Sequence, residues 1–254
     1  MDLKLILIIS TATAIFFLEG VFPHVRGRTK RIAHAVPHIV IAMINAVLTG
    51  LFFAELTSWA TGWSKANHAG ALRLLPFSGP ARYFTAFLLF DLWMYFWHMA
   101  NHRIPFLWRF HRAHHADTDM DTTTALRFHP GELFLSSVAR VPVIVFIGMD
   151  FHHLVVFETV LSISTLFHHS NLAVPDKWDR ILRALIVTPN MHRVHHSKEQ
   201  FETNSNFTSL LTVWDRLNRT FRMREDTRTI TIGLYSFREI KWQRLWGFLI
   251  TPFI

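Results

Sequence analysis

The chain has 254 residues, of which 50% are hydrophobic and 17% are charged, and 26 Lys and Arg against 18 Asp and Glu give a net charge of +8. A low charged fraction with a high apolar fraction excludes an intrinsically disordered chain, which needs the opposite balance. The lack of cysteine excludes disulfides, cysteine-ligated zinc, iron–sulfur clusters and thiolate-ligated haem. The 17 histidines are the unusual feature of this composition.

The first predicted element is an apolar helix over residues 3–22. It carries no charge between Leu5 and Leu18 and is about long enough to cross a bilayer. Lys4 before an apolar core is also typical of a signal peptide, but no small-residue cleavage site follows the core. We therefore predict an uncleaved membrane anchor.

A basic loop, two further spans and a long connection follow. The loop contains four basic residues between positions 26 and 31, and a second span is predicted over residues 35–58. Residues 59–82 contain three glycines and two prolines, which predicts a loop. A third predicted span, residues 83–100, is rich in aromatic side chains and ends in histidines.

Residues 133–168 are predicted to form a helical hairpin. Its two apolar arms are short for full spans, so the hairpin is tilted, partly embedded or extended beyond the lipid. Arg140 and Glu158 lie nine residues on either side of Met149 and should therefore meet at a similar depth. Because an ionised group is costly there unless it is paired, we predict a salt bridge between them. The alternative is that Arg140 holds an anionic lipid head group.

The positive charges predict which side of the membrane each segment faces. Basic loops mark the cytoplasmic side, and threading the chain from the loop at 26–31 places residues 102–130 and 170–254 there as well. The prediction is a single all-α domain over residues 1–254, a multi-pass transmembrane helical bundle with a cytosolic His-rich helical cap. A bacterial inner membrane or the endoplasmic reticulum would suit it. No nucleic-acid motif accompanies the basic residues, so nucleic acid is not an expected partner.

Four groups of histidines have the spacing of metal ligands. They read HMANH, HRAHH, FHH and HRVHH along the chain. Spacings of three and four place imidazoles side by side on a helix, and neutral imidazole binds zinc, copper, iron and nickel. Eight such histidines exceed the roughly four ligands of a tetrahedral site, so two metals fit better than one. The eight are His98, His102, His111, His114, His115, His192, His195 and His196.

The isolated histidines are expected to lie at the surface, where single histidines usually lie. This expectation applies to His24, His34, His38, His68, His152 and His153.

The histidine groups favour some metal chemistries over others. Met99 stands where HExxH zinc hydrolases have their glutamate, so metal-assisted hydrolysis is disfavoured. A transporter would place its ligands at mid-membrane depth instead. Two imidazole-ligated metals near the lipid suit iron and dioxygen chemistry on an apolar substrate, although the ligand type alone does not separate iron from zinc.

The order HMANH, HRAHH, RFHPGE, FHHSN, HRVHH between Phe90 and Asp215 resembles the fatty acid hydroxylase and sterol desaturase superfamily of membrane di-iron enzymes. The resemblance implies two iron ions, O2, and a separate electron donor of the ferredoxin, cytochrome b5 or reductase type. It implies an oxidoreductase, a membrane-bound hydroxylase or desaturase of a fatty acyl, sterol or related lipid. Two alternatives stay open: a membrane zinc protein of the same fold, hydrolytic or structural, and a metal-handling protein without turnover.

The resemblance also implies roles for single residues. It makes the eight spaced histidines ligands and adds His169 as a ninth, with His168 as its neighbour and His129 as a ligand or a partner of one. Ligating imidazoles usually donate their second N–H to an acceptor. Two departures, at Asn206-Phe207-Thr208 and Asn218-Arg219-Thr220, leave the substrate subclass open. The candidate acceptors are Asp91, Asp117, Asp119, Asp121, Glu132, Asn171 and Asp215.

Overall fold

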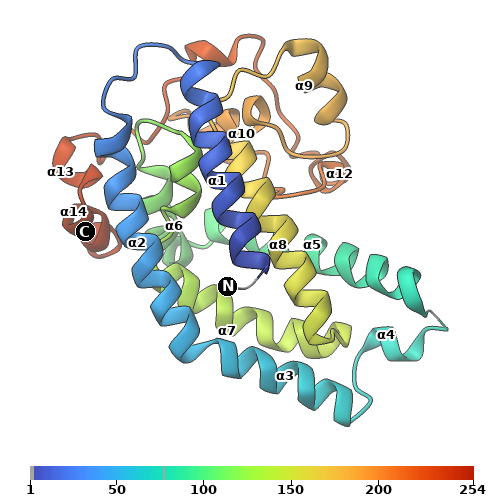
Figure 1. Ribbon diagram of the computed structural model, residues 1–254. Helices are drawn as coiled ribbons and strands as arrows, with labels where there is room; N and C mark the ends of the chain where they lie inside the picture. Colours follow the sequence, from blue (N-terminus) through green and yellow to red (C-terminus); the bar gives the residue numbers. More distant parts are fainter. Residues whose placement is uncertain (1–2, 77) are drawn as a thin grey trace.

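The computed structural model describes residues 3–76 and 78–254, and within these residues every regular element is helical. The prediction of an all-α fold is confirmed (Figure 1). The first two thirds of the chain form α1 (Leu3–Val21), α2 (Arg31–Phe52), α3 (Ala54–Ala66), α4 (Ala71–Leu74), α5 (Gly79–Arg103), α6 (Pro105–His115), η1 (Thr122–Leu126), α7 (Pro130–Ile147) and α8 (Phe151–His169). The remainder forms α9 (Asp176–Leu182), α10 (Pro189–His195), α11 (Gln200–Thr203), α12 (Val213–Leu217), η2 (Thr227–Thr229), α13 (Ile240–Gln243), α14 (Leu245–Ile250) and η3 (Thr251–Phe253).

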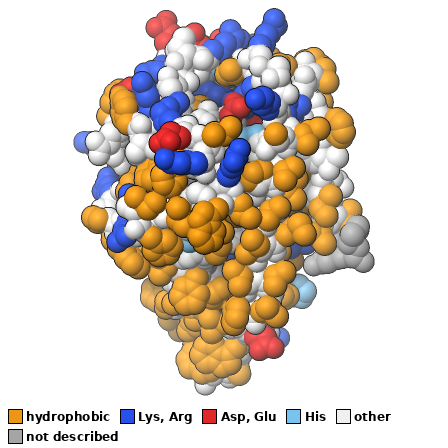
Figure 2. Space-filling view, turned by 90° about the vertical axis from the view of Figure 1, so that its left-hand side faces the viewer, with side chains coloured by type: hydrophobic (Ala, Val, Ile, Leu, Met, Phe, Trp, Pro, Cys, Tyr) orange, Lys and Arg blue, Asp and Glu red, His pale blue; other side chains and the backbone are white. Residues whose placement is uncertain are grey.

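The long helices and the short ones occupy different parts of the molecule. Figure 1 shows α9, α10 and α12 gathered at one end and α3 and α4 at the opposite end. In the face shown by Figure 2, hydrophobic side chains cover most of the lower part, whereas Lys, Arg, Asp and Glu gather mainly at the upper end. This face therefore divides into an apolar part and a charged cap (Figure 2).

Three helices are long and apolar enough to cross a membrane, judged by length and composition: α1, α2 and α7. Only 11% of the apolar window of α1 is buried inside the protein, and 22% of those of α2 and α7. Apolar side chains that face outward on this scale need a nonaqueous environment. α5 and α8 coincide with the other predicted spans but contain more polar residues.

The prediction of one span over residues 35–58 followed by a loop to residue 82 is wrong. α2 already ends at Phe52, and α3 and α4 occupy half of the predicted loop. Gly62 lies inside α3, where a glycine costs about 1 kcal/mol relative to alanine. Burial of Ala60, Thr61 and Ser64 on one face of α3 stabilises this helix in spite of the glycine.

The core of the apolar part lies between α5, α7 and α8. The rings of Phe90 and Phe157 meet edge to face with centroids 4.9 Å apart, and Ile144 and Met149 are fully buried beside them. α7 and α8 diverge from the turn that joins them (Figure 1). The two helices therefore separate with distance from the turn rather than packing along their whole length (Figure 1).

The predicted ion pair between the hairpin arms is confirmed. Arg140 Nη1 lies 3.1 Å from Glu158 Oε1. Lys4 of α1 also reaches the same carboxylate, with Nζ 2.6 Å from Oε2. Pairing reduces the cost of placing ionised groups in apolar helices.

Most of the isolated histidines are not at the surface. His24, His38 and His153 are buried, and the side chain of His34 is only 13% exposed. The expectation is wrong for these residues because each has a polar partner that the sequence does not reveal. His24 Nε2 lies 3.0 Å from Thr227 Oγ1, which is about 200 residues away.

Candidate metal centre

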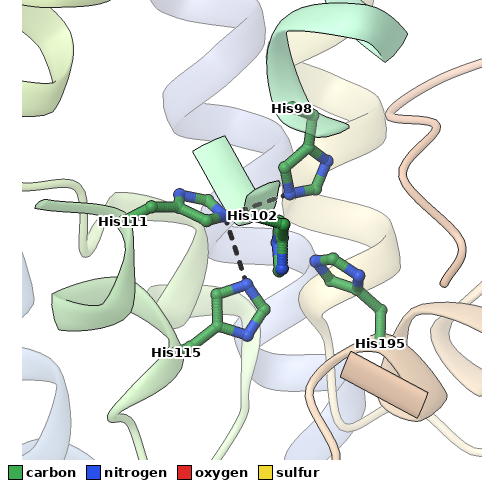
Figure 3. Close-up of side chains that lie close together, drawn as sticks. All are labelled: His98, His102, His111, His115 and His195. Carbon is green, nitrogen blue, oxygen red and sulfur yellow. Dashed lines mark hydrogen bonds between the residues drawn. The ribbon is translucent and has the colours of Figure 1, made fainter. Parts of the chain in front are cut away.

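Nine histidines gather in two adjoining clusters. In each cluster, one ring nitrogen from every member lies within 4.8 Å of the others. The clusters meet where the rings of His115 and His196 stack with centroids 4.4 Å apart. Figure 3 shows the rings of the first cluster turned toward one another. The first cluster is His98, His102, His111, His115 and His195, and the second is His114, His169, His192 and His196.

Each HxxHH triplet is divided between the two clusters. In α6, His111 and His115 face the first cluster, whereas His114 faces the second. The triplet that begins in α10 is divided the other way. His192 and His196, four residues apart, belong to the second cluster, and His195 belongs to the first. Residues four apart share a helix face, and the third lies on a neighbouring face. The repeated spacing therefore builds two sites from two short helices.

The other members come from the ends of long helices. His98 and His102 are one turn apart in the last part of α5, and His169 is the final residue of α8. Pro105 begins α6 directly after α5, and the Thr188 side chain caps α10 by accepting a hydrogen bond from the Met191 N–H. Proline in the first turn and a threonine cap are typical helix starts.

Hydrogen bonds donated by Nδ1–H orient most of these imidazoles. His98, His114, His169 and His195 each donate Nδ1–H to a backbone carbonyl, those of Phe207, Arg127, Thr165 and Ser205, at 2.7 to 3.2 Å. His111 donates instead to Glu132 Oε1 at 2.7 Å. A proton held at Nδ1 leaves a lone pair on Nε2. The Nε2 atoms therefore point into the clusters as acceptors.

Lone pairs face each other at short range in both clusters. In the first, His98 Nε2 lies 3.1 Å from His111 Nε2, one of the contacts drawn in Figure 3. In the second, His169 Nε2 lies 3.1 Å from His114 Nε2. Since both protons of each pair are held at Nδ1, neither contact is a hydrogen bond. Nitrogen atoms about 3 Å apart fit neighbouring ligands of one ion at roughly 2.1 Å.

Four of the clustered histidines, His114, His115, His195 and His196, are neutral at ordinary pH. Burial lowers the pKa of His195 to about 3, and burial together with the neighbouring imidazoles lowers the pKa of His114, His115 and His196 well below its ordinary value. Buried polar atoms without partners are costly, and neither ring nitrogen of His102 has a partner in the described part of the chain. The donor set therefore fits two bound cations of the kind that imidazole prefers.

Two of the predicted acceptors support the clusters. Glu132 accepts directly from His111, as described above. Asp215 acts one step further away, because its carboxylate accepts from the N–H groups of Phe207 and Thr208, and the Phe207 carbonyl accepts from His98. Asp215 thus positions the loop that orients His98.

The other candidate acceptors lie elsewhere. Asp91 accepts from Trp214 Nε1 at 2.8 Å and from the Leu211 N–H, not from a clustered histidine. Asn171 binds the backbone of Val25 and the Arg193 side chain. In both cases the partner is brought in by the fold of the cap, which helix spacing does not predict.

The aspartates after HRAHH also have other partners. Asp117 and Asp121 flank His34, with a 2.9 Å contact to each of its ring nitrogens, and Asp119 pairs with Arg28. Burial raises the pKa of Asp117, but the interactions with His34 outweigh it and hold the pKa well below its ordinary value. These carboxylates join α2 to the loop after α6 and do not contact the clusters by hydrogen bonds.

His129 and His168 lie outside the clusters. His129 caps α7, with Nδ1 accepting from the Gly131 N–H and Nε2 donating to the Leu249 carbonyl, so both of its nitrogens are used. This places His129 as a helix cap rather than beside the clusters. His168 is buried with its ring centroid 4.1 Å from that of His192, consistent with its expected place as a neighbour.

The sequence analysis missed the backbone acceptors. The four carbonyls that orient His98, His114, His169 and His195 leave no signal in the sequence, because every residue has one. The pairing of His34 with Asp117 was also missed, since these residues are 83 positions apart. The Glu132 contact had a signal, because Glu132 is the acidic residue of the RFHPGE segment.

A cavity of about 390 Å³ leads from the clusters between α1, α5, α7 and α8. Its size is in the range of pockets for small organic ligands. Apolar side chains form much of its wall, and both clusters reach it. Its lining includes His98, His111, His114, His168, His169 and His192, with Ile8, Met94, Trp97, Leu126, Leu133, Leu161 and Leu166.

Comparisons with known proteins give a family and relatives. Human alkylglycerol monooxygenase is 28% identical over 215 residues, covering 80% of this chain and 45% of the human protein. The ornithine lipid hydroxylase OlsE of Rhizobium tropici is 30% identical over 142 residues, covering 56% of this chain and 42% of OlsE. The chain thus spans about half the length of the curated relatives it matches. No solved structure matches.

The family model matches the part of the chain that holds both clusters. The fatty acid hydroxylase model covers residues 83–220, which is more than half of the chain and extends from α5 to the loop after α12. Every member of the two clusters lies within these bounds. The chain belongs to the fatty acid hydroxylase family.

Proposed function

We propose that the chain is a membrane-bound, O2-dependent hydroxylase or desaturase of a lipid, with two iron ions held by the nine clustered histidines. The observation that carries the proposal is the set of buried Nε2 lone pairs that face one another at about 3 Å beside an apolar cavity. The names of the relatives, which are lipid hydroxylases and a monooxygenase, support lipid oxidation.

The chain's own residues would hold the two ions, orient the ligands and shield the site from water. The first cluster would hold one ion and the second cluster the other. Iron in such sites supplies oxidative chemistry with O2 at a C–H bond. Glu132 and the backbone carbonyls keep Nε2 of their partners directed inward, and the apolar cavity excludes water and aligns the lipid chain. Electrons would come from a separate donor of the ferredoxin, cytochrome b5 or reductase type.

The membrane arrangement is also part of the proposal. α1, α2 and α7, together with α5 and α8, would be embedded in a bacterial inner membrane or the endoplasmic reticulum. The clusters would then lie in a cytoplasmic cap, and the chain would be one domain. The apolar outward faces of α1, α2 and α7 support embedding, and the basic loop at 26–31 supports the cytoplasmic side.

Labelled dioxygen tests the proposed activity. The iron-loaded protein in membranes would be given reductant, lipid extract and labelled O2, and the lipids would be analysed by mass spectrometry. Hydroxylation adds one labelled oxygen, and desaturation removes two hydrogens. The His195→Ala variant is the control for background oxidation. If neither change occurs in any lipid although iron is bound and reductant is supplied, the proposal is wrong and a zinc protein of the same fold becomes the better account.

A further inference from the structure

Charged side chains lie at the end of the cavity away from the clusters. Arg140 of α7, Glu158 of α8 and Lys4 of α1 all line the cavity that His111 and His192 also line. The Glu158 carboxylate joins the other two, with 3.1 Å to Arg140 Nη1 and 2.6 Å to Lys4 Nζ. The cavity is therefore apolar along its wall and polar at both ends.

Helix geometry gives the separation of the two ends. On α7, Glu132 contacts His111, and Ser136 and Arg140 follow at spacings of four on the same face. A rise of about 1.5 Å per residue over these eight positions is about 12 Å. On α8, Glu158 lies eleven residues before His169, which is about 16 Å. Both helices thus place the charged end about 12 to 16 Å from the clusters.

The guanidinium of Arg140 has unused hydrogen-bonding capacity. Of its five N–H groups, protein acceptors in the described part of the chain engage Nη1, through Glu158, and Nη2, through a long 3.4 Å contact with Ser136. The side chain is 19% exposed and borders the cavity. A guanidinium fork matches the oxygens of a carboxylate or phosphate. Ionisable groups in apolar helices usually mark function rather than stability.

We infer that this end of the cavity binds the anionic head of a single-chain lipid, a carboxylate or a phosphate, at Arg140. Arg140 would exchange part of its pairing with Glu158 for the anionic head, and the hydrocarbon chain extends past the apolar wall toward the histidines. The inference rests on the proposed function. It adds that the substrate is an anionic amphiphile whose reacting carbon lies about 12 to 16 Å from its head.

Binding without turnover tests this inference. The purified protein in nanodiscs of uncharged lipid would be titrated with palmitate, hexadecyl phosphate, hexadecanol and hexadecyltrimethylammonium, without O2 or reductant. We expect one or both anions to bind at least tenfold more tightly than the alcohol, which is about 1.4 kcal/mol. The preferred anion identifies the head group. Equal affinity for anions and alcohol would overturn the inference.

Neutralising the two partners of this ion pair should change anion binding in opposite directions. Arg140→Gln should remove the tenfold preference without changing the affinity for hexadecanol, whereas Arg140→Lys should retain most of it. Glu158→Gln should strengthen anion binding, because it removes the carboxylate that competes for the guanidinium. Arg180→Gln, at an exposed position of α9, is the matched control and should behave as the wild type.

A purely structural ion pair would give a different pattern. Losing either partner would then weaken the binding of every probe alike, and that result contradicts the inference. If Arg140→Gln does not fold, Glu158→Gln decides alone: a gain in anion affinity supports the inference and a loss contradicts it. Anion preference without lipid oxidation would contradict only the proposed function, and oxidation without preference would contradict only the inference.

Discussion

At the scale of single residues, the hydrogen bond made by Nδ1 of an imidazole determines whether its Nε2 has a lone pair for a metal ion. Among residues 3–76 and 78–254, Glu132 is the one carboxylate that contacts a cluster member directly, through His111 Nδ1. The other orienting acceptors are backbone carbonyls, which substitution cannot remove. Glu132 is therefore the position at which this orientation can be tested most simply.

Replacing Glu132 by alanine should weaken metal binding. The imidazole of His111 would lose the acceptor that fixes its tautomer, and loss of such a partner typically costs 10- to 100-fold in metal affinity. Glu132→Gln should cost less, because the amide oxygen still accepts the hydrogen bond. Competition with a chelator measures the affinity, with Glu225→Ala as the exposed control. Unchanged affinity in Glu132→Ala would show that Glu132 does not orient a ligand.

Two buried histidines provide a matched comparison. His195 belongs to the first cluster, whereas His168 is equally buried, touches His192 and belongs to neither cluster. We expect His195→Ala to lose bound metal while still inserting into membranes, and His168→Ala to keep its metal. Elemental analysis of the purified variants measures both. Full metal content in His195→Ala, or equal loss in the two variants, would refute the ligand assignment.

His24 should make the fold sensitive to acid. Burial, with the nearby Arg193 and Arg228, lowers its pKa from 6.5 to about 4. Above pH 6.5, His24 is neutral in both the folded and the unfolded protein. Below pH 6.5, His24 becomes protonated in the unfolded protein but stays neutral in the folded protein, so the free energy of unfolding decreases as the pH falls toward 4. His24→Gln should abolish up to about 3 kcal/mol of this loss. Melting temperatures in detergent from pH 7 to 4 measure it, and identical pH profiles for variant and wild type would contradict it.

At the scale of elements, the sequence predicted which segments are helical and which residues share a helix face better than it predicted the contacts between distant segments. The HxxHH spacings place their histidines correctly because helix periodicity is local. The prediction failed at α3, where glycines indicated a loop but packing against α7 stabilises a helix. It also failed for Asp91 and Asn171, whose partners Trp214 and Val25 are more than 100 residues away. Helix spacing carries no information on contacts of that range.

The junction between α4 and α7 should tolerate no side chain at position 70. Gly70 has a positive φ of 111°, and a Cβ there would lie 2.3 Å from Gly148 Cα. We expect Gly70→Ala to destabilise the protein by about 1 to 3 kcal/mol. Gly62→Ala is the control, because it lies in α3 with nothing within 4 Å and should stabilise by about 1 kcal/mol. Thermal melting in detergent measures both, and a neutral Gly70→Ala would contradict the close approach.

At the scale of the whole molecule, an apolar body and a polar cap meet at the histidine clusters. The lysines and arginines predict that the histidine groups lie on one side of the membrane, and this sidedness stays a prediction. The structure shows that nine of these histidines lie together in two clusters. The cavity between α7 and α8 could not be foreseen, because it depends on how two helices diverge. The substrate subclass likewise depends on the shape and charge of that cavity rather than on the histidine spacing.

X-ray absorption at the iron edge, combined with metal analysis of the same sample, would show whether two iron ions lie among these imidazoles. We expect about two irons per chain, each surrounded by nitrogen at roughly 2.1 Å with no carboxylate of the chain as a main ligand. Three results would contradict two irons at the histidine clusters: no iron after loading, iron bound mainly by carboxylates, or as much iron in the His195→Ala variant as in the wild type.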